Sequence, residues 1–164
     1  MFKREEFAVV LDFLPYGRSK EASKEPLAQA IGEQFFTLLE LVIKPQTSIA
    51  IGDRIYIGKG VRDKVEYIKS RIEFNQLTSG AQRELEGIIR RVVSSREQEY
   101  VNFFNHAGSL SIRTHSLELL PSIGKKHLQA ILSEREKKPL SSFEDIQQRI
   151  PHLGSVEDII VQRI

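Results

Sequence analysis

A five-residue pattern occurs twice in the second half of the chain and constrains its fold more than any other feature. The first copy is Leu-Pro-Ser-Ile-Gly at residues 120–124, and the second is Ile-Pro-His-Leu-Gly at residues 150–154. The two prolines are 30 residues apart, as are the two glycines. A repeat of this length indicates a duplicated supersecondary unit. We therefore expect two similar corners, each joining two helices.

The residue types in the pattern predict the shape of each corner. Proline ends a helix because it cannot donate to the hydrogen-bond ladder and crowds the preceding turn. We expect the apolar side chains of Ile123 and Leu153 to pack under the turns. Gly124 and Gly154 allow a tight or left-handed backbone and the close approach of a ligand.

The helix that begins after the first turn is predicted to bind an anion. Its first N–H groups lack partners within the helix, and the helix dipole favours negative charge there. Lys125 and Lys126 place two cations beside these groups. Backbone amides and lysines suit a phosphate, and such contacts position a nucleic acid without reading its sequence. A plain turn between two helices is the simpler alternative.

These residues resemble the helix-hairpin-helix superfamily, whose usual hairpin is apolar-Pro-Gly-apolar-Gly, often followed by Lys and then Ala. In the first copy the matching positions are Leu120, Pro121, Ile123, Gly124 and Lys126. Ser122 replaces the first glycine of that pattern, and Leu128 stands where a small residue is common. The resemblance implies that a phosphate backbone is contacted by Ser122, Ile123, Gly124, Lys125, Lys126 and His127.

The second copy keeps the shape of this hairpin and loses its charge. Its matching positions are Ile150, Pro151, Leu153 and Gly154. His152 replaces the first glycine, and Ser155 and Val156 stand where cations are expected. Residues 142–146 resemble the linker helix of paired hairpins. The resemblance leaves two roles open for this copy: a second contact through Gly154 and Ser155, or a structural partner of the first hairpin.

A wider resemblance covers nearly the whole chain. Residues 102–105 and 117–126 are similar to an uncharacterised archaeal family that is associated with RNA or nucleotide binding. The resemblance implies an OB-like N-terminal domain followed by a helix-hairpin-helix C-terminal domain. It supplies an expected fold and no established activity.

The first half of the chain has the pattern of strands. We predict strands at residues 7–14, 35–43, 51–58 and 65–74, with a polar loop at 18–26. The last of these segments also suits a helix. We favour a strand because three strands alone would leave a small sheet poorly closed.

The second half has helical periodicity. One long amphipathic helix is predicted to begin at the N-caps Thr78 and Ser79 and to end at Gly108. Four shorter helices are predicted at about 112–120, 124–137, 142–150 and 155–163. The predicted fold is α+β: a small OB-like β-barrel domain over residues 1–76, followed by an all-α tandem helix-hairpin-helix domain over 77–164 with hairpins at 120–126 and 150–156. The long helix suits either domain.

The predicted barrel carries a basic stretch with two tyrosines. Its cations are Arg54, Lys59, Arg62, Lys64, Lys69 and Arg71, against the acidic residues Asp63 and Glu66. Tyr56 and Tyr67 lie within it. A basic groove with aromatic platforms suits single-stranded nucleic acid. Solvated strand edges and tyrosines packed into the barrel explain the same residues equally well.

Composition limits the other classes of function. The net charge is only +2, so binding to nucleic acid has to depend on local patches. The chain has no cysteine and no apolar run near the ~20 residues of a membrane span, and its first residues are charged. The four histidines and the aspartates show no metal-ligand spacing or paired-carboxylate pattern. We expect a cytoplasmic protein without membrane association, metal, cofactor or catalytic residues.

These patterns predict a nucleic-acid-binding protein that contacts the phosphate backbone without strong sequence preference, and not an enzyme. RNA is favoured by the family resemblance alone, and DNA stays open. One alternative is a DNA-binding repair or nuclease-associated subunit, and another is a scaffold for protein interaction. The predicted contacts are the hairpin residues named above and, in the barrel, Arg54, Tyr56, Lys59, Arg62, Lys69 and Arg71.

Overall fold

The computed structural model describes residues 4–17, 25–109 and 115–164. Contacts divide the chain into two compact units, Met1–Ile88 and Ile89–Ile164, and each is described by itself. The division falls inside the helix α1 (Ser79–Ser95). The predicted boundary after residue 76 stays a prediction.

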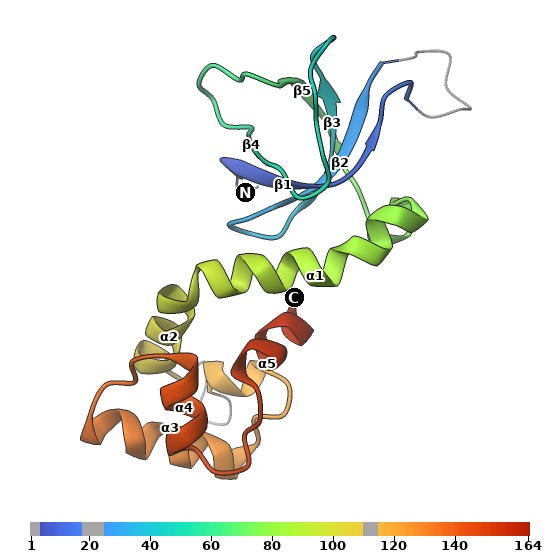
Figure 1. The fold of residues 1–164 in the computed structure, drawn as a ribbon. Helices are drawn as coiled ribbons and strands as arrows, with labels where there is room; N and C mark the ends of the chain where they lie inside the picture. Colours follow the sequence, from blue (N-terminus) through green and yellow to red (C-terminus); the bar gives the residue numbers. More distant parts are fainter. Residues whose placement is uncertain (1–3, 18–24, 110–114) are drawn as a thin grey trace. The chain divides into compact units, whose positions relative to one another are not determined.

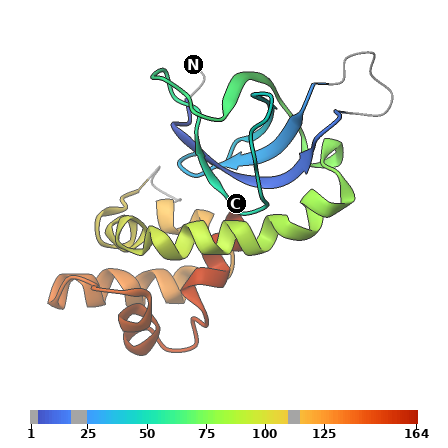
Figure 2. The same ribbon diagram turned by 45° about the horizontal axis from the view of Figure 1, so that its top comes forward.

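The first unit is a curled five-stranded antiparallel sheet (Figures 1 and 2). The strand order is β4-β1-β2-β3-β5, so β4 and β5 are the two edges. All four strand pairs are antiparallel. The strands are β1 (Phe7–Leu14), β2 (Leu27–Gly32), β3 (Leu38–Ile43), β4 (Arg54–Tyr56) and β5 (Val65–Arg71). The core lies on the inner face and is made of alternate residues of these strands, such as Val10, Leu41 and Ile55.

The central strand β2 was not predicted, although all six of its residues are buried. Its sequence, Leu-Ala-Gln-Ala-Ile-Gly, is rich in residues that are depleted in strands. The predicted strand at 35–43 was too long at its start. Phe35 and Phe36 lie in the turn before β3, where Phe36 has a φ of 56°.

A buried carboxylate holds this turn. Glu5 is 6% exposed, and its oxygens accept hydrogen bonds from the backbone N–H groups of Gln34, Phe35 and Thr37 at 2.9–3.1 Å. Only glycine leaves it room at position 32, because a Cβ there would lie 1.9 Å from the Glu5 carboxyl group. A contact between residues so far apart in sequence fixes the turn, which the local pattern does not show.

The last two predicted strands were partly correct. β4 covers only three residues of the predicted 51–58 segment. The choice of a strand over a helix for the segment after residue 65 is confirmed by β5. This strand ends at Arg71, and a 3-10 helix, η1 (Phe74–Gln76), follows it. Six of the seven residues of β5 are exposed.

The connection to α1 is fixed by buried polar groups. Gln29 donates to Glu40 and to the Gln76 carbonyl at 3.1 Å, and its carbonyl accepts from the N–H of Thr78 at 2.8 Å. Thr78 also acts as the predicted N-cap, because its hydroxyl oxygen accepts from the N–H of Ala81 at 3.0 Å.

The long predicted helix is broken into α1 and α2 (Glu97–His106). Arg96 between them has φ −115° and ψ 27°. Beside the break, the Ser95 hydroxyl donates to the Val92 carbonyl at 2.7 Å, a local hydrogen bond that competes with the helix ladder. Hydrophobic periodicity continues across this point, so the break did not show in the pattern.

Three further α-helices follow: α3 (Lys125–Lys137), α4 (Phe143–Arg149) and α5 (Val156–Arg163), close to the predicted ranges (Figure 1). Of the segment predicted as a helix at 112–120, residues 112–114 lie outside the described residues. Its remainder is not α-helical, and Ser116–Leu119 form a 3-10 helix, η2. Phe104, Leu117, Ile131, Ile146 and Ile150 are fully buried and belong to the core of this unit.

Within the described ranges, no helix has the length and apolar character that a membrane crossing requires.

Candidate nucleic-acid interface

The two repeated turns have the same unusual backbone. Ser122 has a φ of 68° and His152 a φ of 62°. Both lie two residues after the apolar position, where the hairpin pattern has its first glycine. The left-handed region costs roughly 1–2 kcal/mol for a residue with a Cβ. The glycine preference at this position therefore has a direct conformational reason, and both turns keep the conformation without the glycine.

Ile123 and Leu153 pack under the two turns as predicted. They are 6% and 5% exposed, whereas Ser122 and His152 beside them are exposed. Each turn therefore has one buried apolar side chain and, directly before it, one residue that is exposed to solvent.

The two final glycines of the pattern differ. Gly154 has a φ of 83°, in the left-handed region that favours glycine. Gly124 has φ −93° and ψ −170°, an extended backbone open to any residue. A Cβ built on Gly124 would meet no atom within 4 Å. The space in front of Gly124 is therefore open, and its glycine is not required by the conformation of the turn.

The first hairpin leaves the start of α3 open. Gly124 is the N-cap and supplies no side-chain hydrogen bond. Within the described part of the chain, the backbone N–H groups of Lys125, Lys126 and His127 have no acceptor. The first turn holds no acidic residue, and both lysines are exposed. The His127 ring lies against the turn, with Nδ1 3.0 Å from the Ser122 carbonyl oxygen. These amides and cations together form a site that suits an anion.

The second hairpin closes the start of α5 with the protein's own groups. Ser155 is the N-cap, and its hydroxyl oxygen accepts from the Asp158 N–H at 3.2 Å. The Val156 N–H donates to Gln147 at 2.9 Å. Glu157 and Asp158 stand in the first turn, where the helix dipole favours them. The predicted contacts Gly154 and Ser155 therefore lie beside two N–H groups that already have acceptors and beside negative charge.

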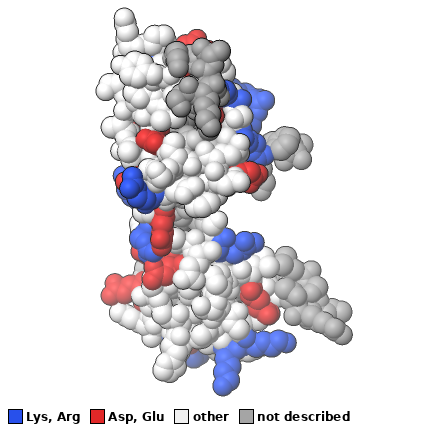
Figure 3. Space-filling view, turned by 90° about the vertical axis from the view of Figure 1, so that its right-hand side faces the viewer, with Lys and Arg blue, Asp and Glu red and all other residues white. Residues whose placement is uncertain are grey.

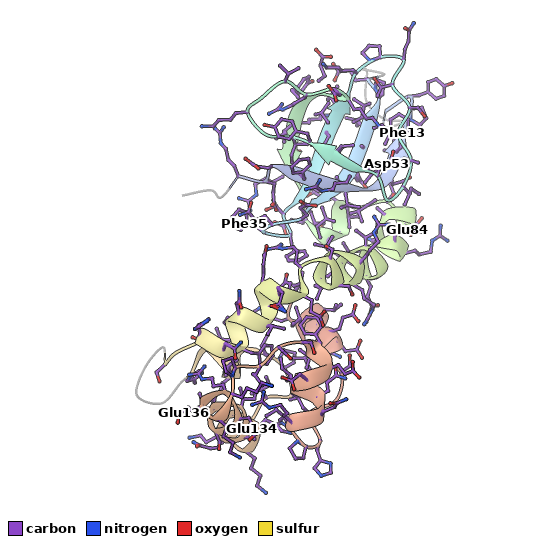
Figure 4. The ribbon with its side chains drawn as sticks, turned by 60° about the vertical axis from the view of Figure 1, so that its left-hand side comes forward. Phe13, Phe35, Asp53, Glu84, Glu134 and Glu136 are labelled. Carbon is purple, nitrogen blue, oxygen red and sulfur yellow. The ribbon has the colours of Figure 1, made fainter. Side chains whose placement is uncertain are left out.

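Arg149 joins α4 to the end of α3. Arg149 of α4 donates to the Glu134 and Lys138 carbonyls at the end of α3, and it also pairs with the Asp145 and Glu134 carboxylates at 3.1 and 3.5 Å. Figure 4 shows Glu134 on α3. Hydrogen bonds from the backbone of Ser141 and from Arg149 hold the pKa of Asp145 below its ordinary value. Hydrogen bonds from Lys137 and Arg149 do the same for Glu134.

The first unit has a cavity of about 670 Å³ between its two edge strands. Leu39 and Ile57 are buried core residues in its lining. The cavity brings together four of the predicted barrel contacts: Tyr56, Lys59, Arg62 and Arg71. The rest of the lining includes Arg4, Glu5, Glu6, Thr37, Gly58, Tyr67 and Ile68.

Two predicted barrel contacts do not line this cavity. Arg54 is engaged elsewhere: its guanidinium donates to Glu33 at 2.7 and 2.8 Å and lies 3.6 Å from the centre of the Phe7 ring. The hydrogen bond to Glu33 raises the pKa of Arg54. Lys69 is exposed on β5 and is absent from the lining. The structure thus gives no support to either residue as part of this groove.

Tyr56 and Arg62 build one wall of the cavity. The Tyr56 hydroxyl oxygen accepts from the Gly60 N–H at 2.9 Å, and its ring meets Phe7 edge-on at 5.4 Å. Arg62 donates to the Gly58 carbonyl at 2.8 Å, so both side chains shape the loop between β4 and β5. Tyr67 on β5 is 43% exposed. Its hydroxyl donates to Glu25 at 3.1 Å, and this hydrogen bond raises the pKa of Tyr67.

Sequence reasoning missed part of this lining. Arg4 precedes the first predicted strand, and Ile68 was counted only as a strand residue. The strand alternation of β5 was the available signal, but the position of β5 at a sheet edge depends on the pairing of strands far apart in sequence.

Charges are mixed on the molecular surface. Figure 3 shows one face, on which Lys and Arg side chains are scattered among Asp and Glu and form no continuous field. The described residues contain no group of three or more His, Cys, Asp or Glu side chains placed to hold a metal ion. The predicted absence of metal, cofactor and catalytic residues stays a prediction.

The structure defines a mixed α/β protein with a curled antiparallel sheet in one unit and helices in the other. The chain belongs to the family described as "Protein of unknown function (DUF655)", whose model matches residues 4–164. It is 43% identical over 148 residues to the uncharacterized protein MJ0038 of Methanocaldococcus jannaschii, covering 90% of this chain and 68% of that protein. It is also similar to the crystal structure of Af1531 from Archaeoglobus fulgidus, a DUF655 structure, with a TM-score of 0.88 and 46% identity over 97% of this chain and 90% of that one. The expected place in an uncharacterised archaeal family is confirmed.

Proposed function

We propose that this protein binds nucleic acid, and that the first hairpin contacts the phosphate backbone. The observation that carries the proposal is the open start of α3. Three backbone N–H groups lack acceptors within the described residues, two exposed lysines flank them, and the first turn has no acidic residue. Phosphate oxygens satisfy amides at a helix start and are attracted by both lysines. Such a contact reads the position of the backbone and not its sequence.

The helical unit supports assignment to the tandem helix-hairpin-helix class. Each of the two turns has a left-handed residue followed by a buried apolar residue at the same position, which is what a duplicated hairpin requires. The first unit supports an OB-like assignment, because it has five short strands curled around one core and a groove with cations and tyrosines. In this proposal the first hairpin binds and the second is its structural partner.

RNA is the proposed ligand on the strength of the family resemblance, and duplex DNA is the nearest alternative. The contacts of the first hairpin suit either backbone. Fluorescence anisotropy with matched single-stranded and double-stranded RNA and DNA, each measured across a salt series, separates the four ligands. Binding has to weaken steeply as salt rises, because counterions are released from the backbone.

The lysine pair provides the site-specific test. Lys125→Ala with Lys126→Ala should weaken binding to every sequence alike and reduce the slope of log K against log salt by about 2, since two phosphate contacts are lost. Lys138→Ala with Arg163→Ala removes the same charge from the helical unit and serves as the control. Both residues of the control pair are exposed. Equal binding by the Lys125 and Lys126 variant and the parent contradicts the proposed site.

A scaffold for protein interaction is the second candidate. It is favoured by the capped second hairpin, whose start is acidic, and by the net charge of only +2. If the protein binds none of the four nucleic acids at low salt, the result favours the scaffold. A nuclease-associated role would show as magnesium-dependent cleavage of the nucleic acid. We propose a binding protein without catalysis and therefore expect no cleavage.

A further inference from the structure

The cavity between β4 and β5 has an apolar base and a charged rim. The sheet is open at these two edge strands, and the cavity of about 670 Å³ lies between them. This volume is within the range of sites that bind small organic groups. Leu39 and Ile57, both at most 5% exposed, give it an apolar base.

The charged residues of the lining favour an anionic ligand. Four cations line the cavity, namely Arg4, Lys59, Arg62 and Arg71, against the two carboxylates Glu5 and Glu6. The Glu5 carboxylate already accepts hydrogen bonds from three backbone N–H groups of the β2–β3 turn. Lys59 is exposed on the loop that borders the cavity. An acidic group at the rim therefore meets more positive than negative charge.

Tyr67 offers an aromatic surface in this lining. Its side chain is 43% exposed, whereas the ring of Tyr56 packs against Phe7 and its hydroxyl is bonded to the Gly60 N–H. A ring beside an apolar cavity with cations at its rim combines the two elements that hold single strands: stacking for the base and positive charge for the backbone.

We propose that this cavity receives an unpaired base of a single-stranded nucleic acid, with Tyr67 as the stacking ring and Lys59 as a phosphate contact. The proposal deepens the proposed function and rests on its claim that the chain binds nucleic acid. It names the class of ligand for the first unit, because a base within a duplex is already paired and stacked and cannot enter a cavity. The backbone contact of the first hairpin makes no such distinction.

The composition of the chain makes a sharp test possible. The protein has no tryptophan, so Tyr67→Trp places the sole indole of the chain at the proposed stacking position. Adding a 12-nucleotide oligouridylate should quench the indole fluorescence in a saturable way, and a blunt RNA duplex of equal length should quench it far less. Phe74→Trp is the control, because Phe74 is 54% exposed in the same unit and does not line the cavity.

Affinity measurements separate stacking from the hydroxyl group of the ring. Tyr67→Ala should weaken single-strand binding about ten-fold. Tyr67→Phe keeps the ring, loses only the hydrogen bond to Glu25, and should bind like the parent. Equal binding by the alanine variant, or quenching by the duplex equal to that by the single strand, overturns the proposal. Uridine monophosphate that quenches as tightly as the oligomer identifies a free-nucleotide pocket and overturns the strand assignment.

The cavity and the phosphate contact of the first hairpin can be tested separately. The Tyr67→Trp titration is repeated with Lys125→Ala and Lys126→Ala also present. Quenching that persists in this background supports the cavity whether or not the lysines contact phosphate. The opposite result is that nucleic acid fails to quench the Trp in place of Tyr67, while the two lysine substitutions still lower affinity. That result supports the phosphate contact of the first hairpin and contradicts binding in the cavity. An acidic peptide that displaces the oligomer and binds more tightly also rejects the nucleic-acid ligand.

Discussion

The two hairpins of the helical unit have the same backbone conformation at one position of the turn. They differ in the residues at the start of the helix that follows. Ser122 and His152 have nearly the same left-handed φ, and Ile123 and Leu153 are buried beneath them. The start of α3 has no cap from a side chain and has two lysines, whereas the start of α5 is capped and acidic. Shape and binding chemistry therefore separate within the repeat. The buried apolar residues preserve the turn, and the next few residues decide whether the helix start is open to a ligand.

Gly154→Ala is expected to have the largest effect on stability. Its φ of 83° lies where a Cβ is unfavourable, so the free energy of unfolding should fall by about 1–2 kcal/mol. Urea unfolding followed by circular dichroism measures the change. Nucleic-acid affinity of the folded variant should stay at the parental value. A parallel loss of affinity shows that the second hairpin also binds, which breaks the proposed division of roles.

Gly124→Ser should separate binding from stability in the first hairpin. The backbone there is extended and a Cβ meets open space, so the serine fits. Its hydroxyl can cap the start of α3 as Ser155 caps α5, and the free energy of unfolding should stay level or rise by a few tenths of a kcal/mol. Affinity should fall about three- to ten-fold, because the serine side chain competes with phosphate for an N–H group. Undiminished affinity contradicts an open amide site.

The smallest expected effect is the response of the helical unit to acid. The folded pKa values of Asp145 and Glu134 lie below their ordinary values, so their contribution to stability is present above the unfolded pKa of about 4 and is lost as pH falls through the folded pKa. Urea midpoints measured from pH 6 to pH 2 should fall in the acid range. Arg149→Met removes one partner of both carboxylates and should flatten this dependence. An unchanged pH profile in that variant shows that Arg149 has no part in it.

Much of the helical unit was predictable because its signals are local. Pro, Gly and apolar spacing placed the two turns, and the ranges of α3, α4 and α5 followed from periodicity and caps. The break at Arg96 was not predictable from hydrophobic spacing, which continues through it. The two lysines of the first hairpin could be read directly from the sequence. The long-range part of the contrast in capping, the hydrogen bond that the Val156 N–H donates to Gln147, could not.

The sheet was less predictable because its signals are distant in sequence. Three of the six residues of β2 are alanine or glycine, and the segment forms a strand because it lies between β1 and β3. The turn at Phe35 and Phe36 depends on the carboxylate of Glu5, some thirty residues away. The basic stretch was recognised as one group, but only the fold separates Arg54, held by Glu33, from the cations that line the cavity.

NMR can follow the individual backbone amides at the start of each helix while a ligand is added. A uniformly ¹⁵N-labelled sample is titrated with a 12-base-pair RNA duplex, a probe of the phosphate backbone. We predict that the amide resonances of Lys125, Lys126 and His127 shift strongly, because phosphate oxygens accept from these N–H groups, while those of Val156 and Asp158 stay in place. Shifts at Val156 and Asp158 with none at the start of α3, or binding without a change at either hairpin, would contradict the claim that the first hairpin is the open, phosphate-binding member of the pair.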